Sequence, residues 1–153
     1  MMNAAHLHLI VNHLPIVGLG FALLINILAL VRRSDDLARL TCWFYILIAV
    51  LAVMPILTGD GAGEIVKTYP GISNDVIELH ETWGYIFFYG LLVNGILGLV
   101  ALWLARKNKG FPIQLGMICL IVAVVLMFFA WKAGMTGGEI RHPEILQGTY
   151  PGL

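Results

Sequence analysis

Four long apolar segments limit what this chain can fold into. They cover residues 7–31, 40–57, 83–105 and 111–131, and each is close to the roughly 20 apolar residues that a helix needs to cross a bilayer. Helices satisfy their own backbone hydrogen bonds in lipid, and no segment alternates polar and apolar residues as a barrel strand does. Because only 12% of the residues are charged, the chain cannot cover a water-facing surface. We therefore expect an all-α integral membrane protein in which residues 1–153 form a single four-helix bundle.

The placement of Lys and Arg predicts how the chain is oriented. Basic residues mark cytoplasmic loops, so both termini and the loop between the second and third segments are expected outside, where most of the acidic residues lie. Residues 1–13 carry histidines in place of a basic leader, so we expect the first segment to remain in the mature protein. The net charge is zero and gives no indication of nucleic-acid binding. Six of the nine basic residues fall in the loops after the first and third segments: Arg32, Arg33, Arg39, Arg106, Lys107 and Lys109.

An internal repeat divides the chain into two helical hairpins. Residues 58–72 and 136–153 share the order Thr-Gly, Gly-Glu-Ile and Thr-Tyr-Pro-Gly. Asn26 and Asn94 are followed by similar apolar sequences, and His13 and His80 precede them by about four helical turns. We expect tandem hairpins related by a pseudo-symmetry axis along the membrane normal.

The histidines are the main candidates for chemistry. All five are expected on the outer side, and ionisable groups at membrane depth tend to be functional. The repeat predicts that one residue from each span end, His13, Glu64, His80 and Glu139, meets the others at the outer mouth of the bundle. Imidazole is the usual axial ligand of b-type heme, and four-helix bundles hold such cofactors between facing helices. We expect His13 and His80 as axial ligands, with His142 or His8 as substitutes, and Glu64 and Glu139 as orienting groups or proton acceptors.

Aromatic residues and glycines near these histidines have two interpretations. The aromatic rings would wall a porphyrin and the glycines would let its plane approach the backbone, or the rings are interfacial anchors and the glycines pack helices together. Asn26 and Asn94 are expected to form hydrogen bonds between helices. The residues in question are Trp83, Tyr85, Phe87, Phe88 and Trp131, and Gly18, Gly20, Gly84 and Gly90.

Other functions remain open. A non-heme iron, manganese or zinc site is one alternative, and copper bound through His6-x-His8 is a weaker one. A third is a cofactor-free accessory subunit of a larger respiratory or photosynthetic complex. No Ser or Cys nucleophile lies beside a histidine, so a redox subunit fits better than a stand-alone enzyme, and Cys42 and Cys119 lack metal-site spacing. The non-heme site would use His13, His80, His142, Glu64, Glu81 and Glu139.

The glycine-rich segments after the second and fourth spans have a structural interpretation as well. Glycines just past a helix end adopt left-handed conformations and stop the helix. On this interpretation Glu64 and Glu139 would pair with nearby basic residues or orient a histidine.

The chain resembles a known family. The His-Leu-Pro-Ile sequence at 13–16, His80 and the Gly-Gly-Glu sequence at 137–139 resemble the bacterial membrane family called domain of unknown function 2231, and the resemblance covers nearly the whole chain. It implies a four-helix protein of the bacterial inner membrane, in a family sometimes fused to or neighboured by redox domains such as Rieske iron–sulfur modules. By fold analogy it implies a small b-type-cytochrome-like subunit, which raises the expectation of heme without fixing it.

Di-heme b-type cytochromes carry histidine ligands near both membrane faces. This chain has no histidine in its cytoplasmic half, so it fits at most one heme, on the outer side. The leading hypothesis is an electron-transfer protein or subunit that passes electrons between a quinone and an outer-face redox protein.

Overall fold

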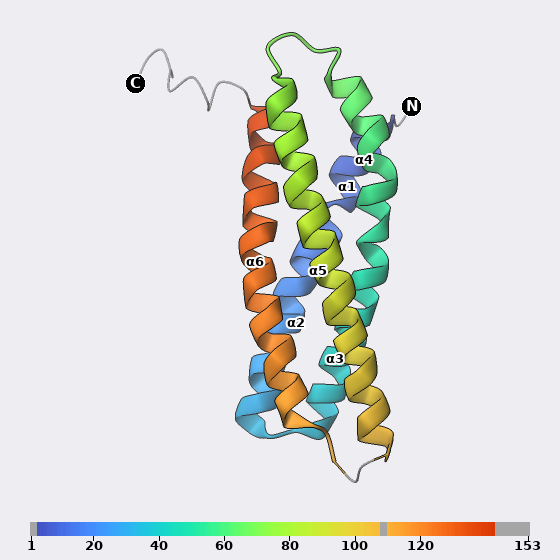
Figure 1. The fold of residues 1–153 in the computed structure, drawn as a ribbon, viewed down its shortest axis with the longest axis vertical. Coiled ribbons are helices and arrows are strands. Elements are labelled where there is room, and N and C mark those ends of the chain that lie inside the picture. The colour runs from blue at the N-terminus through green and yellow to red at the C-terminus, as the bar shows by residue number, and fades with distance from the viewer. Residues whose placement is uncertain (1–2, 108–109, 143–153) are drawn as a thin grey trace, which may run out of the picture.

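The computed structural model describes residues 3–107 and 110–142, and these residues form α-helices and short connections without any strand (Figure 1). Four spans are long and apolar enough to cross a membrane. The expected all-α, four-span architecture is confirmed. The helices are α1 (Ala4–Val11), α2 (His13–Arg32), α3 (Asp35–Leu51), α4 (Val53–Val66), α5 (Asn74–Lys107) and α6 (Ile113–Arg141).

Two of the four spans are interrupted, and proline explains both interruptions. Asn12 separates α1 from α2, and Ala52 separates α3 from α4. Pro15 and Pro55 each lie in the first turn of the helix that follows. A proline inside a helix lacks a donor and its ring clashes with the carbonyl four residues earlier, so each helix breaks one turn before its proline. The spans built by α5 and α6 have no internal proline, and they run unbroken.

The helices extend further than the apolar segments predict. The glycine-rich residues 58–65 belong to α4 and residues 136–140 belong to α6. The interpretation that these glycines stop the helices is therefore wrong. Gly71, in the turn after α4, is the one described glycine with a positive φ, of 87°. The helices continue because their outer turns pack on α1 and α5, and glycine leaves room for that contact: a Cβ on Gly61 would lie 3.1 Å from the Cβ of Ala4.

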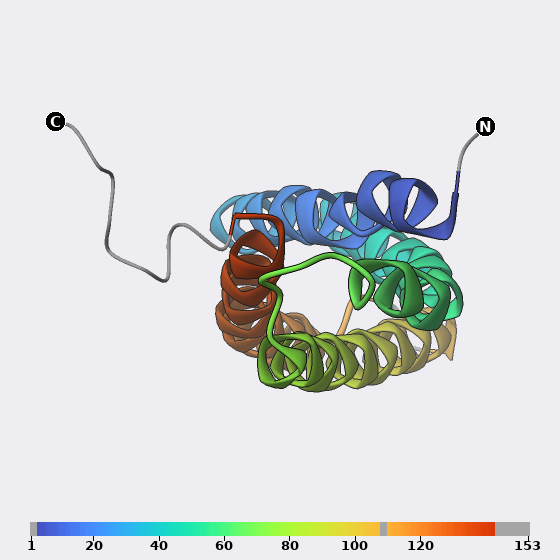
Figure 2. The same cartoon turned by 90° about the horizontal axis from the view of Figure 1, so that it is seen from above.

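The four spans form a closed ring, in which each one packs on two neighbours (Figure 2). α2 packs on α3 and α6, and α5 packs on α3 and α6. α1 packs mainly on α4, which also contacts α5. The core between them is apolar, with Leu19, Ile48 and Leu91 almost fully buried. α1 begins and α6 ends at the same end of the ring (Figure 1).

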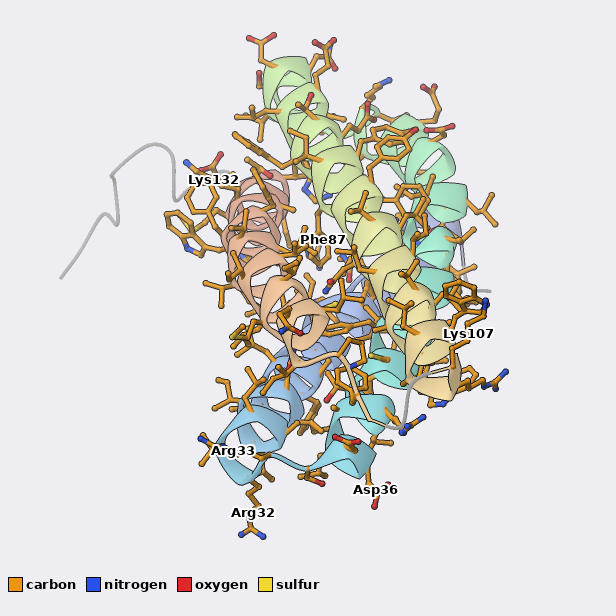
Figure 3. All side chains as sticks on the ribbon, turned by 60° about the horizontal axis from the view of Figure 1, so that its bottom comes forward. Arg32, Arg33, Asp36, Phe87, Lys107 and Lys132 are labelled. Carbon is orange, nitrogen blue, oxygen red and sulfur yellow. The ribbon has the colours of Figure 1, made fainter. Side chains whose placement is uncertain are left out.

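Charge distinguishes the two ends of the bundle. We call the end with Arg32, Arg33, Arg39, Arg106 and Lys107 the basic end, and the opposite end, with Lys132 and most acidic side chains, the acidic end (Figure 3). At the basic end only Arg33 and Ser34 separate α2 from α3.

Two contacts fix the basic end. The Arg39 guanidinium donates to the Ala105 carbonyl at the end of α5, 3.2 Å away. The Phe111 N–H donates to Asp35 Oδ2 over 2.9 Å, which ties the start of α6 to the start of α3.

The outer surface of the spans is suited to lipid. At most 39% of the residues in the apolar window of any span are buried inside the protein, so most apolar side chains face outward. Trp83 and Trp103 on α5 lie roughly 30 Å apart at about 1.5 Å per residue, which matches the thickness of a hydrocarbon core of about 30 Å. Lys107 Nζ lies 4.0 Å from the centre of the Trp103 ring, and Lys132 Nζ lies 5.3 and 5.8 Å from the Trp131 and Trp83 rings. These aromatic residues mark where the bundle meets the two membrane interfaces.

Candidate functional site

His8 and His80 form a pair at the acidic end of the bundle. His8 comes from α1 and His80 from α5, so each hairpin of the chain supplies one histidine. Their ring centres lie 6.3 Å apart and the ring planes are nearly perpendicular, at 81°. Both side chains are partly buried. The two imidazoles are therefore close enough to act on one ligand.

A threonine on the neighbouring helix holds each ring. His8 Nδ1 lies 3.1 Å from Thr58 Oγ1 of α4, and His80 Nδ1 lies 3.2 Å from Thr136 Oγ1 of α6. The backbone carbonyl three residues before each threonine completes the contact. For His80 this is Ala133 O at 2.9 Å, and the Pro55 carbonyl is the corresponding acceptor beside His8.

These contacts assign the proton of each ring. Thr58 Oγ1 donates its hydrogen to the Met54 carbonyl over 3.0 Å, and Thr136 Oγ1 donates to the Lys132 or Ala133 carbonyl over 3.1 Å. The Ala133 carbonyl can only accept, so His80 Nδ1 carries the hydrogen, and in the neutral ring Nε2 presents its lone pair. With the Thr58 hydrogen on the Met54 carbonyl, the Thr58 oxygen accepts from His8 Nδ1, and His8 has the same tautomer.

The two Nε2 atoms form no hydrogen bond with any described residue. Such a ring, with Nδ1–H fixed by the protein and Nε2 free, is the usual state of a metal-ligating histidine.

Two glycines, one on α4 and one on α6, let the imidazole rings lie close to these helices. A Cβ on Gly137 would lie 3.0 Å from His80 Cε1, tighter than ordinary contact, and a Cβ on Gly59 would lie 3.8 Å from His8 Cε1. Each of these glycines follows the threonine that holds the same ring. The Thr-Gly pair that opens the sequence repeat is thus the pair that receives the imidazole. The sequence-based site list omits Thr58 and Thr136, although their place at the start of the repeat was the signal that could have identified them.

His13 does not take part in this pair. Its ring is exposed, and its Nδ1 donates to the Leu9 carbonyl over 2.9 Å within its own span. We expected His13 to face His80 because we counted residues back from Asn26 along an uninterrupted helix. His13 does lie on the same unbroken helix as Asn26, but its ring is exposed there. α1, beyond the break at Asn12, packs on α4, and this packing brings His8 beside His80.

The candidate glutamates are not gathered around the histidine pair. Glu64 is exposed and bonds to Lys67 Nζ over 3.1 Å, and this contact holds the pKa of Lys67 above its usual value. Glu81 lies beside Gly63 of α4, where its Oε1 would be 3.4 Å from an added Cβ. Glu139 is partly buried near the end of α6.

The remaining histidines are exposed at the same end of the bundle: the backbone N–H of His6 caps onto Asn3, and His142 follows α6. Within residues 3–107 and 110–142 no three His, Cys, Asp or Glu side chains are placed to bind one metal ion. Of the expected non-heme ligands, only His80 belongs to the histidine pair, and its partner His8 was expected as a substitute heme ligand.

The expected porphyrin-wall residues divide between core, interface and outer surface. Phe87 is buried between the helices (Figure 3), Trp83 stacks on Phe129 with ring centres 6.0 Å apart, and Phe88 packs against the core. Tyr85 stacks on Tyr89 at the outer surface. The arrangement of Trp83, Tyr85 and Lys132 fits interfacial anchoring.

The four glycines that were expected to line a porphyrin have different surroundings. A Cβ on Gly18 would lie 3.0 Å from Ile48, and one on Gly90 would overlap Leu126, so both pack helices together. Gly20 and Gly84 have open space around them. None of the four has the histidine pair as its neighbour.

The histidine pair lies close to the aromatic residues at the acidic end of the bundle. His80 precedes Trp83 by less than one helical turn, about 4.5 Å along α5, on the side toward the acidic end.

No protein-family model matches this chain, and no curated protein or solved structure is significantly similar to it.

Proposed function

We propose that this protein is a membrane electron-transfer protein or subunit that binds one b-type heme between His8 and His80. The observation that carries the proposal is the matched pair of imidazoles, each with its Nδ1–H held by a threonine and its Nε2 lone pair free. His8 replaces His13 as the partner of His80 in this proposal, because the exposed ring of His13 is held by the Leu9 carbonyl of α1.

The separation of the two rings supports a shared metal ion. Two imidazoles that bind one metal from opposite sides at about 2 Å each, as in zinc–imidazole bonds, have ring centres roughly 6 Å apart. The His8 and His80 ring centres are 6.3 Å apart. At this separation, with ring planes 81° apart, His8 and His80 would hold one metal ion between them.

The number of protein ligands favours heme over a non-heme metal. Non-heme sites need three or four protein donors, and the described residues place two imidazoles together without a third donor. A heme needs only two from the protein, because the porphyrin supplies the remaining four nitrogens. When bound, heme supplies a one-electron redox couple, and the protein's own contribution is to orient the two rings and to keep Nδ1 protonated.

The distribution of charge and the sequence repeat support an orientation and a topology for the bundle. We propose that the basic end is cytoplasmic and that the acidic end, with both termini and the histidine pair, faces outward in a bacterial inner membrane. The two hairpins are proposed to be tandem repeats, supported by the matching His8–Thr58 and His80–Thr136 contacts. Membership of the domain of unknown function 2231 family belongs to the same proposal, as do a quinone and an outer-face redox protein as partners.

The first test is an absorption spectrum of the detergent-purified protein, oxidised and then reduced with dithionite. We expect a Soret band and sharp α and β bands on reduction. His8→Ala and His80→Ala should each abolish the low-spin spectrum, since each removes one axial ligand. His13→Ala is the matched control, because it removes an imidazole from the same span and should leave the spectrum intact.

Two results would contradict the proposal. A featureless visible spectrum from protein produced with heme available would exclude heme, and elemental analysis would then separate a non-heme metal protein from a cofactor-free accessory subunit. Loss of heme in His13→Ala but not in His8→Ala would overturn the choice of ligands.

A further inference from the structure

A second polar region lies in the basic half of the bundle, away from the histidines. A cavity of about 150 Å³ lies among α2, α3 and α6. Arg33, Ser34 and Asp35 line it where α2 meets α3, at the basic end. Asn26 and Tyr45 line it deep in the bundle, and both are at most 3% exposed. Tyr45 lies roughly 15 Å along α3 from the start of that helix, which is about half the thickness of a hydrocarbon core.

The inner end of the cavity holds polar groups that the protein does not fully satisfy. Asn26 Nδ2 donates to the Tyr45 hydroxyl over 2.9 Å and to the Gly116 carbonyl over 3.2 Å. The Asn94 side chain also lies beside the Tyr45 hydroxyl.

Asn94 lies next to Tyr45, just beyond the lining of the cavity. It is fully buried, and neither atom of its amide has a hydrogen-bond partner among the described residues. The amide nevertheless lies near enough to affect the Tyr45 hydroxyl. Buried polar groups that lack protein partners are usually satisfied by ordered water.

The volume of the cavity and the polarity of its lining are both suited to water. A water molecule occupies about 30 Å³ in the liquid, so the cavity has room for several. Its lining offers hydroxyl and amide groups from Thr41, Tyr45 and Asn26. A dry cavity would be lined by apolar side chains alone.

We propose that this cavity is a hydrated inlet that admits water and small polar solutes from the basic end to the Tyr45 hydroxyl, and that it ends there. The buried apolar residues Leu19, Ile48 and Leu91 lie between Tyr45 and the acidic end, and they close the path beyond the middle of the bundle. The inlet does not depend on heme binding, because it shares no residue with the histidine pair.

The two native cysteines provide a direct test. Cys42 and Cys119 both line the cavity, although each is at most 2% exposed. A thiol reacts with a methanethiosulfonate only where water reaches it, because the thiolate is the nucleophile. We expect 2-aminoethyl methanethiosulfonate, added to sealed vesicles with free cysteine on the opposite side as scavenger, to modify both thiols from the basic end. That reaction should be more than about 10-fold faster than the reaction from the acidic end.

Two introduced cysteines report which end of the bundle the reagent reaches, and one variant is designed to block the inlet. In a Cys42→Ala, Cys119→Ala background, Ser34→Cys reports the basic end and Ser73→Cys the acidic end. Ala38→Phe, in a chain with the native cysteines, places a large ring in the lining of the cavity and should slow modification of both thiols. An unchanged thermal unfolding transition of the Ala38→Phe chain in detergent would show that the variant still folds.

Three outcomes would overturn the inlet. One is a lack of reaction at both native thiols in vesicles where Ser34→Cys reacts. Another is equal reaction from both ends, which would indicate an open channel. The third is unchanged modification of Cys42 and Cys119 in Ala38→Phe.

Discussion

At the scale of the residue, the state of each candidate ligand is set by a neighbour on another helix. Thr58 and Thr136 each commit their hydroxyl hydrogen to their own helix and accept from a histidine. Partners of this kind fix the tautomer of a ligating histidine and hold its ring in place. The sequence identifies the histidines as candidates, but a tautomer depends on contacts between residues that are fifty or more positions apart.

Replacing the threonines should weaken heme binding, if the proposed function holds. Thr58→Val and Thr136→Val keep the side-chain volume but remove the oxygen that accepts from Nδ1–H. We expect heme affinity to fall by roughly 10- to 100-fold in each case, as for other partners of ligating histidines, measured by heme titration of the apoprotein.

Thr82→Val is the matched control for these variants. Thr82 makes the same bond to its own helix, to Glu78 O over 2.9 Å, but holds no histidine. An equal loss in Thr82→Val and Thr136→Val would show that the effect comes from helix stability and not from the contact with the ring.

At the scale of the element, glycines and prolines decide how closely the helices approach and where they break. Pro15 and Pro55 each lie in the first turn of a helix, and each interrupts its span about one turn earlier. On α5, a Cβ at Gly98 would lie 3.1 Å from the Cys42 carbonyl oxygen, whereas a Cβ at Gly84 would meet nothing within 4 Å. Two glycines of one helix therefore have different roles, and composition alone does not distinguish them.

This difference predicts opposite effects of the same substitution. Gly98→Ala should destabilise the bundle by about 1–3 kcal/mol, because a backbone atom of α3 cannot rotate away from the added methyl group. Gly84→Ala should be neutral or stabilising by up to about 1 kcal/mol, since alanine orders the helix better than glycine. Thermal unfolding in detergent would measure both, and equal destabilisation would contradict the packing of α3 on α5.

At the scale of the whole molecule, charge and aromatic residues set how the bundle sits in a membrane. The basic end carries Arg32, Arg33 and Arg39, and the Trp83–Trp103 separation matches one hydrocarbon thickness. The cytoplasmic location of the basic end is a prediction from this asymmetry.

Cysteine labelling of intact cells tests the orientation. In the cysteine-free background, a membrane-impermeant maleimide should label Ser73→Cys and leave Ser34→Cys unlabelled. Replacing Arg32, Arg33 and Arg39 by Gln should allow part of the population to invert, so that Ser34→Cys becomes partly labelled. Labelling of Ser34→Cys with the arginines intact would show that the basic end faces outward.

The sequence by itself determined the number and position of the spans. The thickness of the bilayer and the need to satisfy every backbone group leave a long apolar segment only one regular structure. The sequence also placed the histidines at one end, because four crossings fix the end at which each loop lies.

Only the tertiary structure decided which histidine faces His80 and what the glycine-rich segments do. The break at Asn12 and the packing of α1 on α4 place His8, and not His13, beside His80. Neighbouring helices hold residues 58–65 and 136–140 in the helical state, although glycine has little preference for it. Both results depend on contacts between segments distant in the chain, and a periodic pattern along one segment carries no information about them.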